Sequence, residues 1–178
     1  LTSQGSHSFL GLNPLLQDFG MMIHPPILYM GYVASILPFL VMVSRQQLDA
    51  LALYWIELSS KYALGILTVG IILGSWWAYR ILGWGGYWAW DPVENASLLP
   101  WLLQLALFHA VIAKHYVMIR WLSLLGFCVT MVATGLIRSG SMVSVHSFMS
   151  NDTMLYAFGV FVTVLLLWGC YHRRYELF

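Results

Sequence analysis

The sequence predicts an all-α, polytopic membrane protein that forms a single domain over residues 1–178 and crosses the membrane with about five helices. Hydrophobic residues make up 60% of the chain and charged residues only 8%, whereas a soluble domain carries about 25% charged residues. The alternating apolar and polar residues of a membrane β-barrel are absent from the sequence. The net charge of +1, with no cluster of Lys and Arg, argues against a nucleic-acid partner and leaves membrane lipid as the surroundings.

Five apolar stretches account for the predicted spans, and no internal repeat or linker divides them. Each approaches the roughly 20 residues that a helix needs to cross the hydrocarbon core. The expected spans run from Pro26 to Ser44, from Tyr62 to Tyr79, from Ala96 to Ala113, from Trp121 to Ile137 and from Met154 to Tyr171.

The basic residues predict the orientation of these spans. One set of connections and the C-terminus carry six of them, which are Arg45, Lys61, Lys114, Arg120, Arg173 and Arg174. The other set carries only Arg80 and Arg138. Since basic residues accumulate on the inner side of a membrane, we expect the C-terminus inside, in the matrix or cytoplasm. The N-terminus and the loop at residues 80–97 are then expected outside, in the intermembrane space or periplasm.

The predicted outer loop at residues 80–97 concentrates aromatic side chains. Its sequence WGGYWAWDPVENAS contains Trp84, Tyr87, Trp88 and Trp90 among several glycines. Anchoring at the membrane interface is one interpretation, because Trp and Tyr accumulate there. The glycines favour another, since they allow a sharp turn or the close approach of another surface. We therefore expect a flat aromatic floor for a large planar ligand.

The same loop contains the carboxylates Asp91 and Glu94. Asp at the N-cap, Pro92 at the first helical position and Glu three residues after the cap predict a capping box that begins the third span. This structural role does not exclude contact with a partner.

Three of the six histidines are candidate ligands. His24, followed by two prolines, and His146 are both expected at the outer face, beside the aromatic loop. His109 lies within the third span, about 20 Å from its outer end at ~1.5 Å per residue, where an ionisable residue points to function. Each has a structural alternative, such as a hydrogen bond to a neighbouring helix. Because imidazole is a common ligand of metals and haem, we expect all three to be haem-iron ligands.

Arg80 and Arg138 are the two basic residues of the outer loops. Guanidinium groups bind carboxylates well in a partly desolvated site, so both are candidate partners of the haem propionates. The alternative is that each only ends its helix at the interface.

Three stretches resemble a known family: LNPLLQDFGMMIHPPILYMGYV (12–33), LGSWWAYRILGWGGYWAWDPVENAS (73–97) and LIRSGSMVSVHSF (136–148). They are similar to CcmF of cytochrome c maturation, or to its nitrite-reductase-pathway relative, and include the tryptophan-rich WWD signature. The resemblance implies a haem lyase that joins haem vinyl groups to the thiols of an apocytochrome c. It also implies that His24 and His146 ligate the incoming haem, and that His109 is one axial ligand of a resident b-type haem.

The sequence departs from that family in one respect. The family's proteins are several times longer, and this chain offers no second deep histidine to pair with His109. We therefore expect a split mitochondrial CcmF subunit, from the N-terminal region, in the mitochondrial inner membrane; a piece of a bacterial inner-membrane protein is the alternative. The implied partners are companion CcmF fragments, a CcmH-like subunit, the haem carrier CcmE and apocytochrome c. Alternative functions are a haem exporter or chaperone that forms no thioether bond, and a scaffold that has lost haem binding.

Overall fold

The computed structural model describes residues 17–45, 47–83, 85–140, 144 and 152–173. In this part of the chain all regular structure is helical, which confirms the predicted all-α class. The elements are α1 (Phe19–Ala34), α2 (Leu37–Ser44), α3 (Ala50–Trp77), the π-helical turn η2 (Ala78–Leu82), α4 (Pro92–Ile112), α5 (Tyr116–Ser139) and α6 (Asp152–Arg173).

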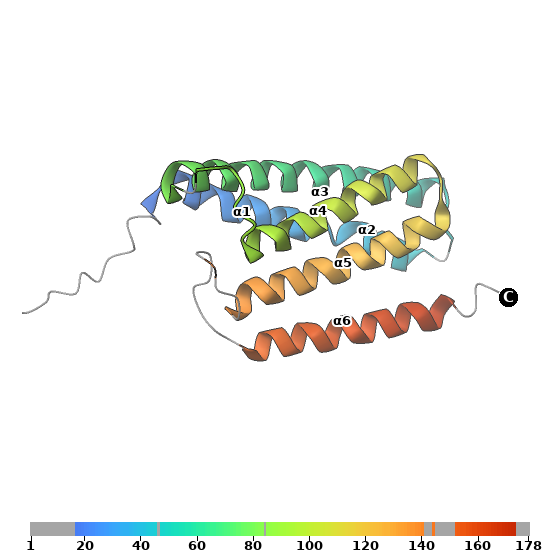
Figure 1. Ribbon diagram of the computed structural model, residues 1–178. Helices are drawn as coiled ribbons and strands as arrows, with labels where there is room; N and C mark the ends of the chain where they lie inside the picture. Colours follow the sequence, from blue (N-terminus) through green and yellow to red (C-terminus); the bar gives the residue numbers. More distant parts are fainter. Residues whose placement is uncertain (1–16, 46, 84, 141–143, 145–151, 174–178) are drawn as a thin grey trace, which may run out of the picture.

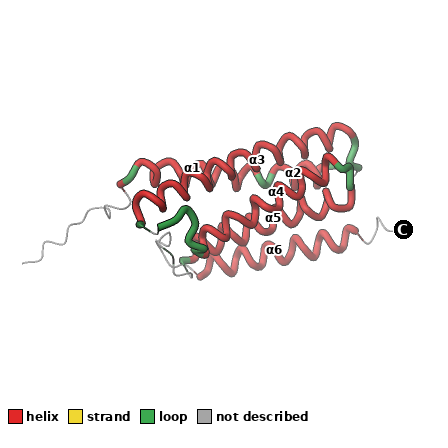
Figure 2. Tube along the Cα trace, turned by 45° about the horizontal axis from the view of Figure 1, so that its top comes forward, coloured by secondary structure: helices red, strands yellow, loops and turns green. Residues whose placement is uncertain are grey.

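The helices form a bundle in which successive long helices run in opposite directions (Figures 1 and 2). α1 packs along α3, α3 along α4, α4 along α5 and α5 along α6. One end of the bundle therefore carries the start of α1, the loop at residues 83–91 and the end of α5 (Figure 1). We call this the aromatic end. The short connections between α2 and α3 and between α4 and α5 lie at the opposite end.

Four helical runs are long and apolar enough to cross a membrane, which supports a polytopic membrane protein. They are Phe19–Ser44, Ala50–Leu82, Pro92–Ile112 and Tyr116–Ser139. In α6 the apolar stretch among the described residues is the shorter Tyr156–Trp168, so the fifth span stays a prediction. The sidedness of the bundle also stays a prediction.

The first span begins earlier than expected and is broken in the middle. Helix α1 starts at Phe19, because the Asp18 side chain accepts a hydrogen bond from the Gly20 N–H at 2.8 Å and caps the helix. The helix then continues through Pro25 and Pro26. The break before α2 coincides with Pro38, whose nitrogen has no hydrogen to donate, and the Gln104 amide donates to the Ser35 carbonyl there, at 3.2 Å.

Helix α3 also begins earlier than the predicted second span. Asp49 caps it by accepting from the Ala52 N–H at 2.7 Å, so residues 50–61, expected as a loop, are helical. Lys61 and Glu57 form an ion pair four residues apart on this added stretch, a spacing that supports a helix.

Glycines bring α1 and α3 into close contact. A Cβ at Gly31 would lie 2.6 Å from Leu67 Cδ2, and a Cβ at Gly70 would lie 3.1 Å from the Leu28 Cα. In a membrane, where lipid tails are as apolar as leucine, such small residues allow helices to pack by van der Waals contact. The approach of the two backbones buries Leu28, Tyr32 and Leu67 in one cluster.

Two further apolar clusters join the remaining helices. The first lies among α3, α4 and α5 and consists of Ile56, Leu107, Ala110, Val111 and Ile119. The second joins α2, α5 and α6 and consists of Phe39, Leu124, Phe127, Cys128 and Val162. The first cluster holds α4 beside α3, which in turn fixes the loop between them.

The start of α4 has the predicted capping box. The Val93 N–H donates to Asp91 Oδ1 at 2.8 Å, while Glu94 Oε2 accepts from the N–H groups of Asp91 and Ala89 at 3.2 and 3.0 Å. The Ser144 hydroxyl also donates to Asp91 Oδ1 at 2.8 Å. The chain after α5 is therefore tied to the first turn of α4.

Replacing the cap should loosen this turn and leave the rest of the bundle in place. We expect Asp91→Ala to destabilise the start of α4 by about 0.5–2 kcal/mol, measured as faster hydrogen exchange at the Val93 amide. Asp49→Ala is the matched control, because it removes the equivalent cap of α3 at the opposite end. Unchanged exchange at Val93 in Asp91→Ala would contradict the assigned cap.

Candidate functional site

His24 lies on α1 at the aromatic end and is buried, with 8% of its surface exposed. Its Nδ1 is 2.7 Å from the carbonyl oxygen of Gly70 on α3. A carbonyl oxygen only accepts, so Nδ1 carries the hydrogen and donates it. In the neutral ring the lone pair is then on Nε2. Histidines that ligate a metal are commonly oriented in this way, by a hydrogen bond from the other ring nitrogen.

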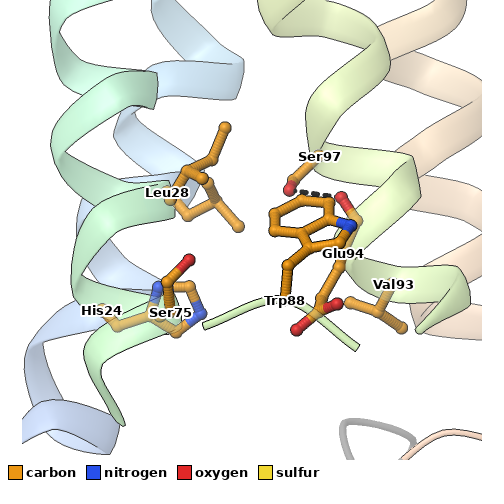
Figure 3. Close-up of a pocket in the computed structure, with 9 residues that line it drawn as sticks. His24, Leu28, Ser75, Trp88, Val93, Glu94 and Ser97 are labelled. Atoms are coloured by element: carbon orange, nitrogen blue, oxygen red, sulfur yellow. Dashed lines mark hydrogen bonds between the residues drawn. The ribbon is translucent and has the colours of Figure 1, made fainter. Parts of the chain in front are cut away.

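A small cavity separates His24 from the aromatic loop (Figure 3). His24, Leu28 and Ser75 line one side, and Trp88, Val93, Glu94 and Ser97 line the other. The cavity has a volume of about 30 Å³, which is room for one or two water molecules. A porphyrin does not fit between His24 and Trp88 in this arrangement, so a planar ligand would reach His24 only after Trp88 had moved.

The aromatic side chains do not form the flat floor expected from the sequence. The rings of Trp88 and Trp90 are nearly perpendicular, at 87° with centroids 6.3 Å apart. Tyr87 instead stacks on Tyr79 of η2, with centroids 4.5 Å apart. Trp90 and Tyr87 are 72% and 60% exposed, so the loop presents separate aromatic surfaces. Trp84 lies outside the described residues.

The backbone of this loop turns sharply, as its glycines predict. Gly83 and Gly85 have φ values of 65° and 72°, which glycine adopts without steric cost. Trp90 also has a positive φ, 59°, which costs a residue with a Cβ roughly 1–2 kcal/mol. The hydrogen bond from the Asn95 amide to the Trp90 carbonyl, at 3.1 Å, holds this strained conformation against α4.

Both candidate propionate partners lie near the aromatic end and contact aromatic rings. The Arg80 guanidinium lies 4.3 Å from the Trp76 ring centroid and forms an ion pair with Asp18 at 2.7 Å. The Arg138 guanidinium lies 5.1 Å from the Tyr29 ring centroid. Arg80 and Arg138 are exposed. No local sequence pattern indicates this ion pair, because Asp18 is 62 residues from Arg80.

The other two candidate histidines differ from His24 in their placement. His146 lies outside the described residues, although Ser144, two residues earlier, contacts Asp91 at the aromatic end. His109 is in the last turn of α4, toward the opposite end, and its exposed ring lies beside Phe108 with centroids 5.7 Å apart. Among the described residues, no three His, Cys, Asp or Glu side chains are grouped as a metal site. Because His24 lies at the aromatic end and His109 in the last turn of α4, toward the opposite end, the two belong to separate sites.

Sequence reasoning also missed the residues that surround His24. Gly70, Gly74, Ser75 and Ser97 all lie at its ring or in the adjacent cavity. The available signal was the spacing of Gly70 and Gly74, because small residues four apart are typical of close helix packing in membranes. The sequence alone does not indicate which helix packs against the face of α3 that carries Gly70 and Gly74.

The comparisons with known proteins are consistent across most of the chain. Residues 4–144 match the family described as Cytochrome C assembly protein. The chain is 46% identical over 164 residues to the cytochrome c-type biogenesis protein CcmF of Pseudomonas fluorescens, with 88% of this chain and 24% of that protein covered. It is 43% identical over 177 residues to the cytochrome c-type biogenesis protein NrfE of Haemophilus influenzae, with 92% and 27% covered.

A solved structure supports the same assignment. The fold is similar to that of the cytochrome c heme lyase CcmF, with a TM-score of 0.63 and 31% sequence identity, over 86% of this chain and 26% of that one. The chain spans about a quarter of the length of the relatives it matches. It belongs to the cytochrome c assembly protein family and corresponds to part of a CcmF-type cytochrome c biogenesis protein.

Proposed function

We propose that this chain is a subunit of the haem lyase that attaches haem covalently to apocytochrome c, and that its aromatic end presents the haem. The observation that carries the proposal is the placement of His24. A buried imidazole oriented by a backbone carbonyl lines a cavity whose other wall is formed by Trp88 of the aromatic loop and by the start of α4. Family membership agrees, since the similar proteins are named as cytochrome c biogenesis proteins and a heme lyase.

His24 supplies one proposed axial ligand to the substrate haem, and His146 supplies the other. Trp88 now forms the wall opposite His24, so the loop has to move as haem enters. Its exposed indoles and Tyr87 then cover the macrocycle, with Trp84 as a further member of the surface. Arg80 and Arg138 lie near enough to the aromatic end to receive the propionates, and Arg80 would exchange Asp18 for a propionate.

The reaction itself is the addition of a thiol across each vinyl group of haem. A carbon–sulfur bond forms, the thiol proton goes to the neighbouring vinyl carbon, and no net oxidation or reduction takes place. The residues named here contribute positioning, because they hold the vinyl edge in one place for an approaching thiol. The apolar loop contributes the exclusion of water. Delivery of haem by CcmE and binding of a CcmH-like subunit with apocytochrome c complete the proposed assembly.

His109 is the proposed ligand of a second, resident b-type haem, which when bound would supply electron transfer. His109 would hold the iron of that haem, because its ring is exposed on α4 and an ionisable side chain facing lipid is costly unless a partner covers it. Companion chains corresponding to the rest of a CcmF-type protein would cover this face and provide the second ligand. Their membrane, and that of this chain, is the mitochondrial inner membrane in this proposal.

Replacing both outer histidines tests the haem-presenting role. We expect His24→Ala combined with His146→Ala to reduce haem bound at the outer site, and holocytochrome c formed, by at least about tenfold. Even the loss of a residue that only orients a ligand costs about 10–100-fold in affinity. Haem is measured by absorbance of the purified assembly, and holocytochrome c by haem-stained gels.

His115→Ala is the control, because this exposed residue precedes α5 at the opposite end. Undiminished haem at the outer site of the double variant would remove the ligand assignment. Haem transferred to its carrier without any thioether formation in the unaltered assembly would instead identify an exporter or chaperone.

A second variant tests the resident haem. In the assembly that already carries His24→Ala and His146→Ala, adding His109→Ala is expected to abolish the remaining low-spin imidazole absorbance, because a ligand of the resident haem is lost. Ile112→Ala is the matched control, since Ile112 is exposed three residues further along the same helix. An unchanged spectrum in His109→Ala would favour a scaffold subunit without a haem ligand.

A further inference from the structure

The His24 ring packs against α3 at two positions, Gly70 and Gly74, where α3 has no side chain. Gly70 and Gly74 are four residues apart, so they lie on the same face of α3, and this face packs against α1. We call the surface formed by these two glycines the glycine seat. It is enclosed, because His24 is buried and Gly70 is in the buried part of α3.

Gly74 leaves space that the imidazole fills. A Cβ added at Gly74 would collide with the His24 ring, with Cε1 as the nearest atom and with Nδ1 and Nε2 at 2.8 and 2.9 Å. The obstacle is a ring on a backbone that is itself packed against α3, so it cannot swing away as the end of a flexible chain can. Any larger residue at position 74 would therefore displace the imidazole.

Gly70 contributes in two ways. A Cβ at this position would lie 3.1 Å from the Leu28 Cα and 3.2 Å from the Leu28 nitrogen, so glycine sets how closely α1 approaches. Its carbonyl oxygen accepts the hydrogen bond from His24 Nδ1 at 2.7 Å. Close approach and ring orientation therefore depend on the same residue.

We propose that Gly74 and Gly70 are positioning residues for His24, and that the glycine seat fixes the ring's direction and its tautomer for ligation of haem. This inference rests on the proposed function. A hydrogen bond from Nδ1 to a carbonyl makes Nε2 the basic nitrogen. Because the ring is already held against the α3 backbone, it loses little rotational freedom when iron binds. Both effects increase the affinity of the imidazole for iron.

Ordinary helix packing accounts for Gly31 in the same interface, whereas Gly70 and Gly74 also contact the His24 ring. A Cβ at Gly31 would meet the Leu67 side chain and the Leu67 backbone nitrogen, which is helix-to-helix contact with no candidate ligand in it. Gly74 instead faces the three atoms Cε1, Nδ1 and Nε2 of an imidazole, and the Gly70 carbonyl binds that same ring. The seat is thus specific to the proposed ligand.

A double-mutant cycle on the complete assembly separates positioning from packing. Haem, iron protoporphyrin IX, is titrated into the purified unaltered assembly and into assemblies carrying Gly74→Ala, His24→Ala, both changes, or Gly65→Ala. Gly65 is the matched control, because it is also in α3 and a Cβ there would meet no atom within 4 Å. The dissociation constant and the low-spin imidazole absorbance of the outer site are recorded.

We expect Gly74→Ala to weaken haem binding at the outer site by about 10–100-fold, as is typical when an orienting partner of a ligand is lost. Gly65→Ala should stay within about twofold of the unaltered assembly, and adding Gly74→Ala to His24→Ala should change affinity by no more than about twofold. Equal losses from Gly74→Ala in both backgrounds would show that it acts through the fold, and would overturn the proposal. Unaltered affinity in His24→Ala would instead refute the ligand role itself.

A measurement on the unaltered, haem-free assembly remains informative if Gly74→Ala fails to fold. The ¹⁵N chemical shifts of the His24 ring, assigned by their loss in His24→Ala, report which nitrogen carries the hydrogen. The glycine seat requires the Nδ1–H tautomer. A ring protonated on Nε2 alone would overturn the positioning role, whatever the outcome for haem binding.

Discussion

The close approach of α1 to α3 is the contact on which the rest of the aromatic end depends. It is possible because glycines replace side chains at the crossing, with Gly31 against Leu67 and Gly70 against Leu28. α3 continues without interruption into η2 and then into the aromatic loop. The same contact therefore sets both the position of His24 and the point from which the loop departs. The ion pair between Asp18, which caps α1, and Arg80, in η2, joins the two elements again at their ends.

The aromatic loop is held at its far end by the first turn of α4. Glu94 accepts from two backbone N–H groups of the loop, and Asn95 donates to the carbonyl of Trp90. These bonds offset the strain of a non-glycine residue at positive φ. Trp88, between the two anchored ends, is the indole that reaches the cavity. A loop fixed at both ends is suited to the proposed movement of Trp88, because the anchors need not change.

Features that depend on neighbouring residues could be predicted from the sequence, and features that depend on distant ones could not. The capping box at Asp91 and Glu94 is formed by residues three apart, and the apolar runs by themselves predict the long helices. Helix α1 begins earlier than the apolar run predicts, since the cap at Asp18 outweighs the two prolines within the helix. The partner of His24 is 46 residues away, and no local pattern indicates it. The perpendicular rings of Trp88 and Trp90 depend on a loop path that composition cannot specify.

His24 and His109, the two candidate haem-ligating histidines among the described residues, differ in the groups that orient their rings. A ligating histidine needs a partner for its other ring nitrogen, because that bond sets the direction and basicity of the ligand. For His24 the partner is a backbone carbonyl of this chain, in an interface that glycines close. For His109, within the part of the chain that the structure describes, the neighbouring group is the adjacent Phe108 ring, and the imidazole faces outward from α4. The site at the aromatic end can thus be oriented by this chain alone, whereas a site at His109 needs both its second ligand and its orienting partner from elsewhere in the proposed assembly.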